Sequence, residues 1–202
     1  LLNLGALLND AGKVSESVAA YESARAIFEG LGDRRSEALA LHNLGRSHTE
    51  QQRFGDAIRY LGQALALRVS VEDQRGAVSS RLGLGQALSD SGKVAEAIPI
   101  LEAGLAESRR LEVVELEAEA RLRLFGAFRK AGRLAEAIDH LTEYIALRDK
   151  LLSASSQAAI AEMQTRFESE RSAREIEVLN RSEALHFQLD EGGKEEIRLK
   201  YR

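Results

Sequence analysis

The four histidines have the widest chemical range of any side chains here, since imidazole can act as an acid, a base or a metal ligand. They are scattered along the chain, at His42, His48, His140 and His186. His42 and His48 lie six residues apart, and about 600° of helical rotation places them on different faces. The chain has no cysteine, which excludes a cysteine-ligated zinc site and a disulfide scaffold. We therefore expect no metal site and no cofactor.

Two other patterns could do chemistry, but each has a simpler structural explanation. The glycine-rich string LGLGQ, residues 82–86, falls inside a predicted helix, whereas a phosphate-binding loop needs free backbone N–H groups. Acidic residues recur in one column, at Glu16, Asp56, Glu96 and Glu136. They fall in the first turn of predicted helices, where negative charge stabilises the positive end of the helix dipole. We expect no catalytic residue in this chain, because no acid–base pair shares a predicted pocket.

The composition indicates a helical protein and excludes two classes of partner. A single proline among 202 residues, with plentiful Ala, Leu, Glu and Arg, favours helices. The net charge of −4 offers no basic face for nucleic acid, and no apolar run approaches the roughly 20 residues that cross a bilayer. We expect no nucleic-acid partner and no membrane segment. The lack of cysteine suits a reducing compartment, so we expect a cytoplasmic location.

The sequence realigns on itself every 40 residues, which predicts a repeated structural unit. A leucine column contains Leu4, Leu44, Leu84 and Leu124. The next column contains Gly5, Gly45 and Gly85, with Phe125 in the fourth copy. Small residues occupy a further column, at Ser17, Ala57, Ala97 and Ala137, and Val18, Ile58, Ile98 and Ile138 follow them. Four copies in register without a shift are hard to obtain by chance.

Each unit is predicted to be a pair of helices. Leu4 and Leu8 lie on one helical face, and Gly12 and Gly92 predict helix ends, because glycine adopts the left-handed cap conformation without strain. The pattern predicts helices over residues 1–11, 14–30, 35–51, 54–71, 74–91, 94–110, 114–131 and 134–151. Such antiparallel pairs stack into an all-α superhelix. The first helix is shorter than its equivalents, so we expect the natural chain to extend upstream.

Three stretches share a string of apolar, glycine, small and acidic residues at fixed spacing. They are LGALLNDAGKVSESV, LGQALSDSGKVAEAI and FGAFRKAGRLAEAI, and LGRSHTEQQRFGDAI matches the string less closely. This string resembles the tetratricopeptide repeat (TPR). The 40-residue period exceeds the usual length of about 34, so the sequence is similar to the long-helix form of kinesin light chains and bacterial peptide-responsive regulators. The resemblance implies a right-handed TPR superhelix over residues 1–152, with about four repeats of which the first is truncated.

The resemblance also implies a binding groove, because the first helix of each TPR pair lines the concave surface. Mapping the repeat onto this sequence assigns to the groove Asn3, Asn9, Asn43, Arg46, Thr49, Gln86, Arg123 and Arg129. The same mapping adds Ala6, Leu39, Ser79, Leu82, Ser89 and Gly126. Asparagine amides can both donate to and accept from a peptide backbone, and arginines can pair with ligand carboxylates.

This set resembles only part of the carboxylate clamp of chaperone-binding TPR domains. Asn43 and Arg123 match positions of that clamp, but Glu119 stands where the clamp needs a lysine. We therefore do not expect a chaperone C-terminus as the ligand.

The tail lacks the repeat. Residues 153–190 are predicted to form one long capping or coiled-coil-like helix, with Ile160, Met163 and Phe167 packing on the fourth repeat. We expect a break at the Gly192-Gly193 pair, with residues 191–202 frayed or in a separate short helix, and a possible homodimer through residues 165–189. The stretch from residue 144 to 181 resembles the segment that ends TPR sensor regions in bacterial signalling proteins, where it leads into an output domain.

These features predict a non-catalytic protein- or peptide-binding module, the sensory or scaffolding part of a larger bacterial signalling protein. One alternative is the input region of a signalling enzyme, a diguanylate cyclase or histidine kinase, whose catalytic domain lies after residue 202. A second alternative is a stand-alone scaffold or assembly protein.

Overall fold

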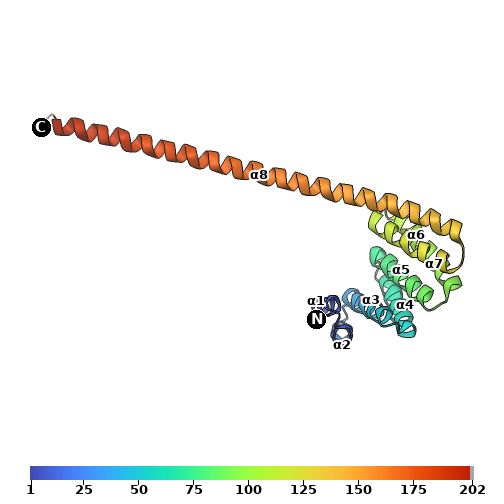
Figure 1. The fold of residues 1–202 in the computed structure, drawn as a ribbon. Coiled ribbons are helices and arrows are strands. Elements are labelled where there is room, and N and C mark those ends of the chain that lie inside the picture. Colours follow the sequence, from blue (N-terminus) through green and yellow to red (C-terminus); the bar gives the residue numbers. More distant parts are fainter. Residues whose placement is uncertain (201–202) are drawn as a thin grey trace. The chain divides into compact units, whose positions relative to one another are not determined.

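The computed structural model describes the backbone of residues 1–200, and within that range it contains eight helices and no strand (Figure 1). The helices are α1 (Leu2–Asp10), α2 (Val14–Leu31), α3 (Arg34–Glu50), α4 (Phe54–Ser70), α5 (Gln74–Asp90), α6 (Val94–Arg110), α7 (Val114–Lys130) and α8 (Leu134–Lys200). The all-α prediction is confirmed. Helices α1 to α7 begin and end within one residue of the predicted bounds, because each boundary carries a local signal that repeats every 40 residues.

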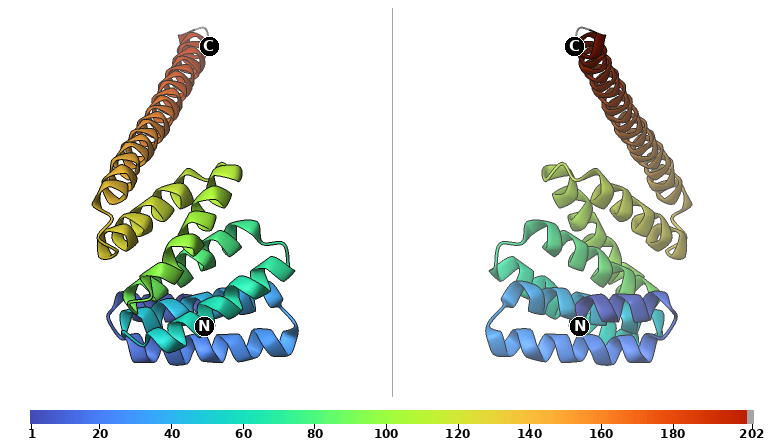
Figure 2. Two further views of the ribbon diagram at one scale, coloured as in Figure 1. Left: turned by 90° about the vertical axis from the view of Figure 1, so that its right-hand side faces the viewer. Right: turned by 90° about the vertical axis from the view of Figure 1, so that its left-hand side faces the viewer.

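The chain divides into two compact units, Leu1–Leu151 and the residues from Leu152 onward. In the first unit, consecutive helices pack against each other from α1 to α7, and the first helices of successive repeats, α3, α5 and α7, also touch (Figure 2). This is the stack of paired helices that the repeat predicts.

Each turn between consecutive helices contains one residue with positive φ. Four of these residues are glycines, Gly12, Gly32, Gly92 and Gly132, with φ between 69° and 87°. The equivalent turns without glycine place Gln52, Glu72 and Glu112 in the same left-handed region. The turn geometry is therefore a property of the repeat, and glycine only relieves its strain.

The glycine column lets the two helices of a repeat approach closely. A Cβ on Gly45 would clash with Leu61 Cγ, and one on Gly85 would lie 2.5 Å from Leu101 Cγ. No other residue fits without moving those leucines, which are themselves fully buried. The packing interpretation of these glycines is confirmed.

The core follows the predicted columns. Leu44, Leu124 and the alanines Ala57 and Ala97 are fully buried. Ser17 takes the place of alanine in the first repeat, and its buried hydroxyl donates to the Gly5 carbonyl oxygen at 2.8 Å, so the polar atom there is satisfied.

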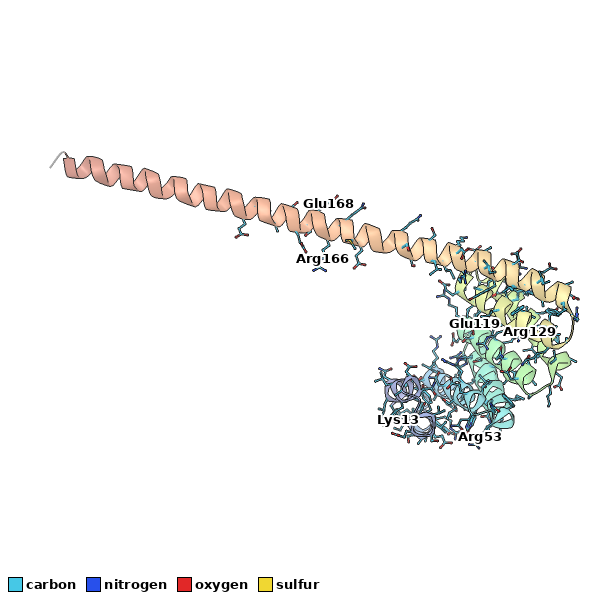
Figure 3. All side chains as sticks on the ribbon, in the orientation of Figure 1. Lys13, Arg53, Glu119, Arg129, Arg166 and Glu168 are labelled. Carbon is cyan, nitrogen blue, oxygen red and sulfur yellow. The ribbon has the colours of Figure 1, made fainter. Side chains whose placement is uncertain are left out.

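Helix α8 differs from the prediction in three respects. It runs past residue 151, where the eighth predicted helix ends, directly into the predicted tail helix. It continues from Leu134 to Lys200 without a break at Gly192-Gly193, because two glycines cost only about 1 kcal/mol each and helix-forming residues flank them. Met163, predicted to pack on the fourth repeat, is exposed. The side chains of Ile160 and Phe167 lie outside the described residues. Exposed side chains of α8 form i,i+4 pairs. Arg166, which is labelled in Figure 3, donates from Nε to Glu170 Oε1 at 3.2 Å.

Candidate functional site

A pocket of about 430 Å³ lies on the first helices of three successive repeats. Helix α3 contributes His42, Arg46, Thr49 and Glu50, helix α5 contributes Ser79, Gly83 and Gln86, and helix α7 contributes Glu119 and Arg123. All of these residues except Gly83 have polar side chains. The first helices thus form a polar hollow, at the position where the TPR resemblance implies a groove.

The repeat explains how these residues come together. Gln86 occupies the column of Arg46, one repeat later, and Gly83 occupies the column of Asn43 and Arg123. A Cβ at Gly83 would lie 2.9 Å from Leu61 Cδ2. The third repeat therefore presents no side chain in this column of the pocket.

Four of the eight predicted polar groove residues line this pocket. They are Arg46, Thr49, Gln86 and Arg123. The other four do not. Asn3 is exposed on α1 and Asn43 is half-buried on α3, while Arg129 is exposed near the end of α7, 5.7 Å from the centre of the Phe125 ring (Figure 3).

The amide of Asn9 is occupied by protein contacts. Its Nδ2 donates to Glu50 Oε2 at 2.9 Å, and its Oδ1 accepts from Ser47 Oγ at 3.2 Å. Asn9 therefore links the first repeat to the second and orients Glu50 at the edge of the pocket. Of the additional mapped residues, Ser79 lines the pocket.

Two of the additional residues mapped to the groove are buried, so that placement was wrong for them. Leu82 is fully buried and packs in the cluster that contains Leu101 and Leu124. Ser89 is buried near the end of α5, and its carbonyl oxygen accepts from Lys130 Nζ at 3.2 Å. Both lie on the side of α5 that packs against neighbouring helices.

The two pocket arginines differ in how their charges are balanced. Arg123 Nε donates to Glu119 Oε1 at 3.1 Å, an i,i+4 pair within α7. Glu119, which lies near the start of α7 (Figure 3), is engaged by this pair. Among the described residues, no carboxylate pairs with Arg46. Arg46 therefore makes no ion pair of 4 Å or less, although Glu50, one helical turn further along α3, brings a balancing negative charge to the edge of the pocket.

A buried polar network lies at the His42 wall of the pocket. His42 Nδ1 lies 3.3 Å from Ser80 Oγ, and Ser80 Oγ also accepts from Arg68 Nη1 at 3.1 Å. Arg68 Nη1 donates to the Gly76 carbonyl oxygen at 2.6 Å, and its Nε lies 3.7 Å from Asp73 Oδ2. The Ser80 hydroxyl accepts from Arg68 and keeps a proton that it can donate to His42 Nδ1, in the tautomer that carries the imidazole proton on Nε2.

Burial holds His42 in its neutral form. Desolvation, followed by the charges of Arg68, Arg46 and Arg123, lowers the pKa of His42 from 6.5 to about 3. The imidazole therefore carries no charge at neutral pH and contributes only hydrogen bonding to the pocket wall.

The other described histidine rings have packing roles. His48 stacks on Tyr60 with ring centres 5.3 Å apart, and His140 stacks on Phe128 at 5.2 Å. Burial lowers the pKa of both imidazoles. The side chain of His186 lies outside the described residues. In the part of the chain that the structure describes, no three His, Asp or Glu side chains gather in a way that could bind a metal.

The sequence mapping missed four residues that line the pocket, which are His42, Glu50, Gly83 and Glu119. A signal for His42 was present, because His42, Arg46 and Thr49 follow the i, i+4, i+7 spacing of one helical face. Its column contains Leu82, however, which suggests a core position. His42 is both a core residue and a pocket residue, because its side chain is buried and also lines the pocket.

An all-α stack of paired helices, with a polar pocket on its first helices, defines a helical repeat protein, a class whose stacked units form extended surfaces. Family models described as tetratricopeptide repeat match residues 1–68, 42–110 and 82–151. The chain belongs to the tetratricopeptide repeat family. Repeats of this family are typically non-catalytic and bind proteins.

Solved structures with the same fold include two Rap proteins. A Rap protein complexed with competence and sporulation factor has a TM-score of 0.68 at 19% identity, over 74% of this chain and 42% of that one. The Rap conjugation gene regulator of plasmid pLS20, in complex with the Phr* peptide, has a TM-score of 0.65 at 16% identity, over 72% and 40%. This chain spans about two fifths of the length of these Rap proteins.

The kinesin light chain TPR-like repeats of Podosopora anserina also share the fold. Their TM-score is 0.62 at 22% identity, with 74% of each chain covered. The predicted likeness to kinesin light chains and to bacterial regulators is confirmed at the level of fold. No curated protein matches this chain in sequence. Within residues 1–200, none of the helices combines the length and apolar character that crossing a membrane requires.

Proposed function

We propose that the pocket on α3, α5 and α7 binds an extended peptide that carries a carboxylate, with Arg46 as the principal anchor. The observation that supports this most directly is the unpaired guanidinium of Arg46 in a polar hollow formed by three successive repeats. A guanidinium holds a carboxylate through two parallel hydrogen bonds. Arg123 stands across the pocket, already shared with Glu119, and would supply a second, weaker contact.

Hydrogen-bonding groups around Arg46 suit a peptide backbone. Gln86 Nε2 donates to Asp90 Oδ2 at 2.8 Å, which leaves the Gln86 amide oxygen to accept from a ligand N–H. Thr49 Oγ1 donates to the Gly45 carbonyl oxygen at 2.9 Å and can still accept. Longer ligands would reach Asn43 in the same groove, and Asn3 and Arg129 at its margins. Asn9 would act indirectly, because its amide already holds Glu50 and Ser47.

The Rap structures favour a peptide over a folded protein as the ligand. One of them was solved in complex with the Phr* peptide. We propose that this chain also binds a peptide, whose sequence need not be that of the Phr* peptide.

The wider role we propose is the sensory or scaffolding part of a bacterial signalling protein that acts in the cytoplasm. Ligand capture would reshape the superhelix, and the long helix α8 would transmit the change, either to a second copy paired through residues 165–189 or to an output domain. A diguanylate cyclase or histidine kinase domain after residue 202 is one form of this proposal, and a stand-alone scaffold is the other. The reading frame beyond residue 202 distinguishes the two.

A peptide-selection experiment tests the pocket. The chain is immobilised and exposed to a random library of short peptides, and retained peptides are sequenced. We expect enrichment of Asp and Glu, and an affinity for the best peptide that falls about ten- to a hundredfold in Arg46→Ala, the effect of losing one charged hydrogen-bonded contact.

Arg75→Ala is the matched control, because Arg75 is an exposed arginine on α5 that does not line the pocket. Binding that is equally strong in the wild type and in Arg46→Ala contradicts the assignment of Arg46. A library that shows no acidic enrichment contradicts the ligand class.

A further inference from the structure

The pocket on α3, α5 and α7 contains an acidic group that a carboxylate ligand does not use. Glu50, the last residue of α3, lines the pocket and is exposed. Among the residues that the structure describes, no lysine or arginine forms an ion pair with Glu50. Its Oε2 accepts a hydrogen bond from Asn9 Nδ2 at 2.9 Å. Because that donor is a neutral amide, the hydrogen bond orients Glu50 but does not balance its charge.

The equivalent carboxylate one repeat later shows how the fold can balance such a charge. Asp90, the last residue of α5, accepts from Lys130 Nζ at 2.6 Å and from Gln86 Nε2 at 2.8 Å. Lys130 occupies the same column in the fourth repeat. A negative charge at the carboxyl end of a helix opposes the helix dipole, so the lysine relieves an unfavourable position. Glu50 has the same unfavourable position without the cation.

The opposite charges of α3 do not neutralise each other. Arg46 and Glu50 have the i,i+4 spacing at which opposite charges often pair, but no ion pair joins them. Glu50 is held by Asn9, and Asn9 Oδ1 in turn accepts from Ser47 Oγ at 3.2 Å. The same pocket therefore offers a ligand one cation, on Arg46, and one anion, on Glu50.

The pocket as a whole has no net charge. Two arginines and two glutamates line it, and His42 is neutral. Arg123 and Glu119 pair with each other, which leaves Arg46 and Glu50 as the two charges without an ion-pair partner. Such a pocket gives no long-range attraction for a strongly acidic peptide. A ligand with a carboxylate alone would be attracted by Arg46 and repelled by Glu50.

We propose that the peptide bound in this pocket carries a lysine or arginine side chain close to its acidic group, and that Glu50 binds this basic side chain. The proposal rests on the peptide ligand proposed above, in which Arg46 binds the acidic group. Asn9 acts as a positioning residue, because it orients Glu50 and is not itself required to touch the peptide.

The spacing of the two charges favours one arrangement in the ligand. One helical turn separates Arg46 from Glu50, about 5.4 Å along the helix axis. In an extended peptide, side chains two residues apart point to the same side and lie about 6.6 Å apart, whereas successive side chains point to opposite sides. We therefore expect the acidic and basic residues at positions i and i+2 of the peptide.

The peptide selection described above tests this proposal when it is repeated with Glu50→Gln. Glutamine keeps the shape of the side chain and an oxygen that can accept from Asn9, but it removes the charge. With the wild type we expect Lys and Arg to be enriched two residues from the enriched Asp or Glu. Glu50→Gln should lose the basic enrichment and keep the acidic one. Glu22→Gln is the matched control, because Glu22 is an exposed glutamate on α2 that does not line the pocket.

Isothermal titration calorimetry measures the contact itself. The probes are the best retained peptide and a copy with glutamine in place of its lysine or arginine. The copy should bind the wild type about fivefold more weakly, the effect of one ion pair at an exposed site, and should bind Glu50→Gln as well as the parent peptide does. Asn9→Ala should reduce this selectivity for the basic side chain and keep the acidic enrichment, a readout that a general loss of stability would not produce.

The possible results separate this proposal from the one on which it rests. Acidic enrichment without basic enrichment overturns the role of Glu50 and leaves the role of Arg46 intact. Basic enrichment that is equal in the wild type and in Glu50→Gln also overturns the role of Glu50. Basic enrichment that needs Glu50, without acidic enrichment, supports the role of Glu50 and overturns that of Arg46. Enrichment of neither charge overturns both.

Discussion

Replacing His42 by leucine should change how the stability of the repeat unit depends on pH. Leucine is the residue that the repeat itself places in this column, at Leu82, where it is fully buried. The substitution removes a titratable group from the wall of the pocket. It also leaves Ser80 and Arg68 without one neighbour, but that cost does not vary with pH around neutrality.

The sign and size follow from the lowered pKa. The pKa of His42 is about 3 in the folded chain and 6.5 when unfolded, so between these values the unfolded state binds a proton that the folded state does not. Wild-type stability therefore falls as the pH drops below 6.5, by about 1.4 kcal/mol per pH unit. At pH 5 the loss from this group is about 2 kcal/mol, and the full loss near pH 3 is about 5 kcal/mol. That is a large share of a typical domain stability.

Urea unfolding of the wild type and the His42→Leu variant at pH 7.5, 6 and 5 measures the effect. We expect the difference in unfolding free energy between the two proteins to shift by about 2 kcal/mol in favour of the variant between pH 7.5 and pH 5. Carboxylates and the other histidines titrate in both proteins and cancel in the difference. A difference that stays constant across this range would refute the conclusion that His42 is neutral and buried.

Three further substitutions test the packing and the turns of the repeat by thermal unfolding. Gly85→Ala should destabilise the fold by about 1–3 kcal/mol, because its Cβ would lie 2.5 Å from Leu101 Cγ. Gly62→Ala has nothing within 4 Å of its Cβ and should instead stabilise the fold by up to about 1 kcal/mol. Equal effects at both sites would contradict the close approach of the helices at Gly85. Gln52→Gly should raise the stability by about 1 kcal/mol, because Gln52 has a backbone φ of 59°, which is strained for a residue with a side chain. A loss of stability in this variant would show that the left-handed turn carries little strain.

The fold was predictable from the sequence because every structural feature recurs. Helix ends, close approaches and small-residue contacts each occupy a column, so a signal that is weak in one copy is supported by the others. Gly45 and Gly85 show this, since their close contacts with Leu61 and Leu101 could be anticipated from the column alone. The course of α8 could not, because no repeated copy of the tail exists to indicate whether Gly192-Gly193 ends a helix.

The pocket was predictable only in part, because its composition depends on contacts between repeats. Helical periodicity placed Arg46 and Arg123 on the correct face, but it could not show that Asn9 is held by Glu50 and Ser47. Nor could it show that Arg123 is neutralised by Glu119 within its own helix. Which polar side chains remain available to a ligand is decided by pairings that the sequence pattern does not encode.

The His42 column shows how a repeat can modify its binding face without losing its fold. The third repeat fills this column with Leu82, buried in the apolar core. The second repeat fills it with a histidine, whose partner is the Ser80 hydroxyl of α5, and Arg68 of α4 donates to the same hydroxyl. A polar group at a core column is tolerable only when neighbouring repeats supply its partners, since an unpaired one costs about 1–3 kcal/mol. His42, Ser80 and Arg68 therefore depend on one another for their hydrogen bonds. Residues from three helices together form the wall of the pocket beside Arg46.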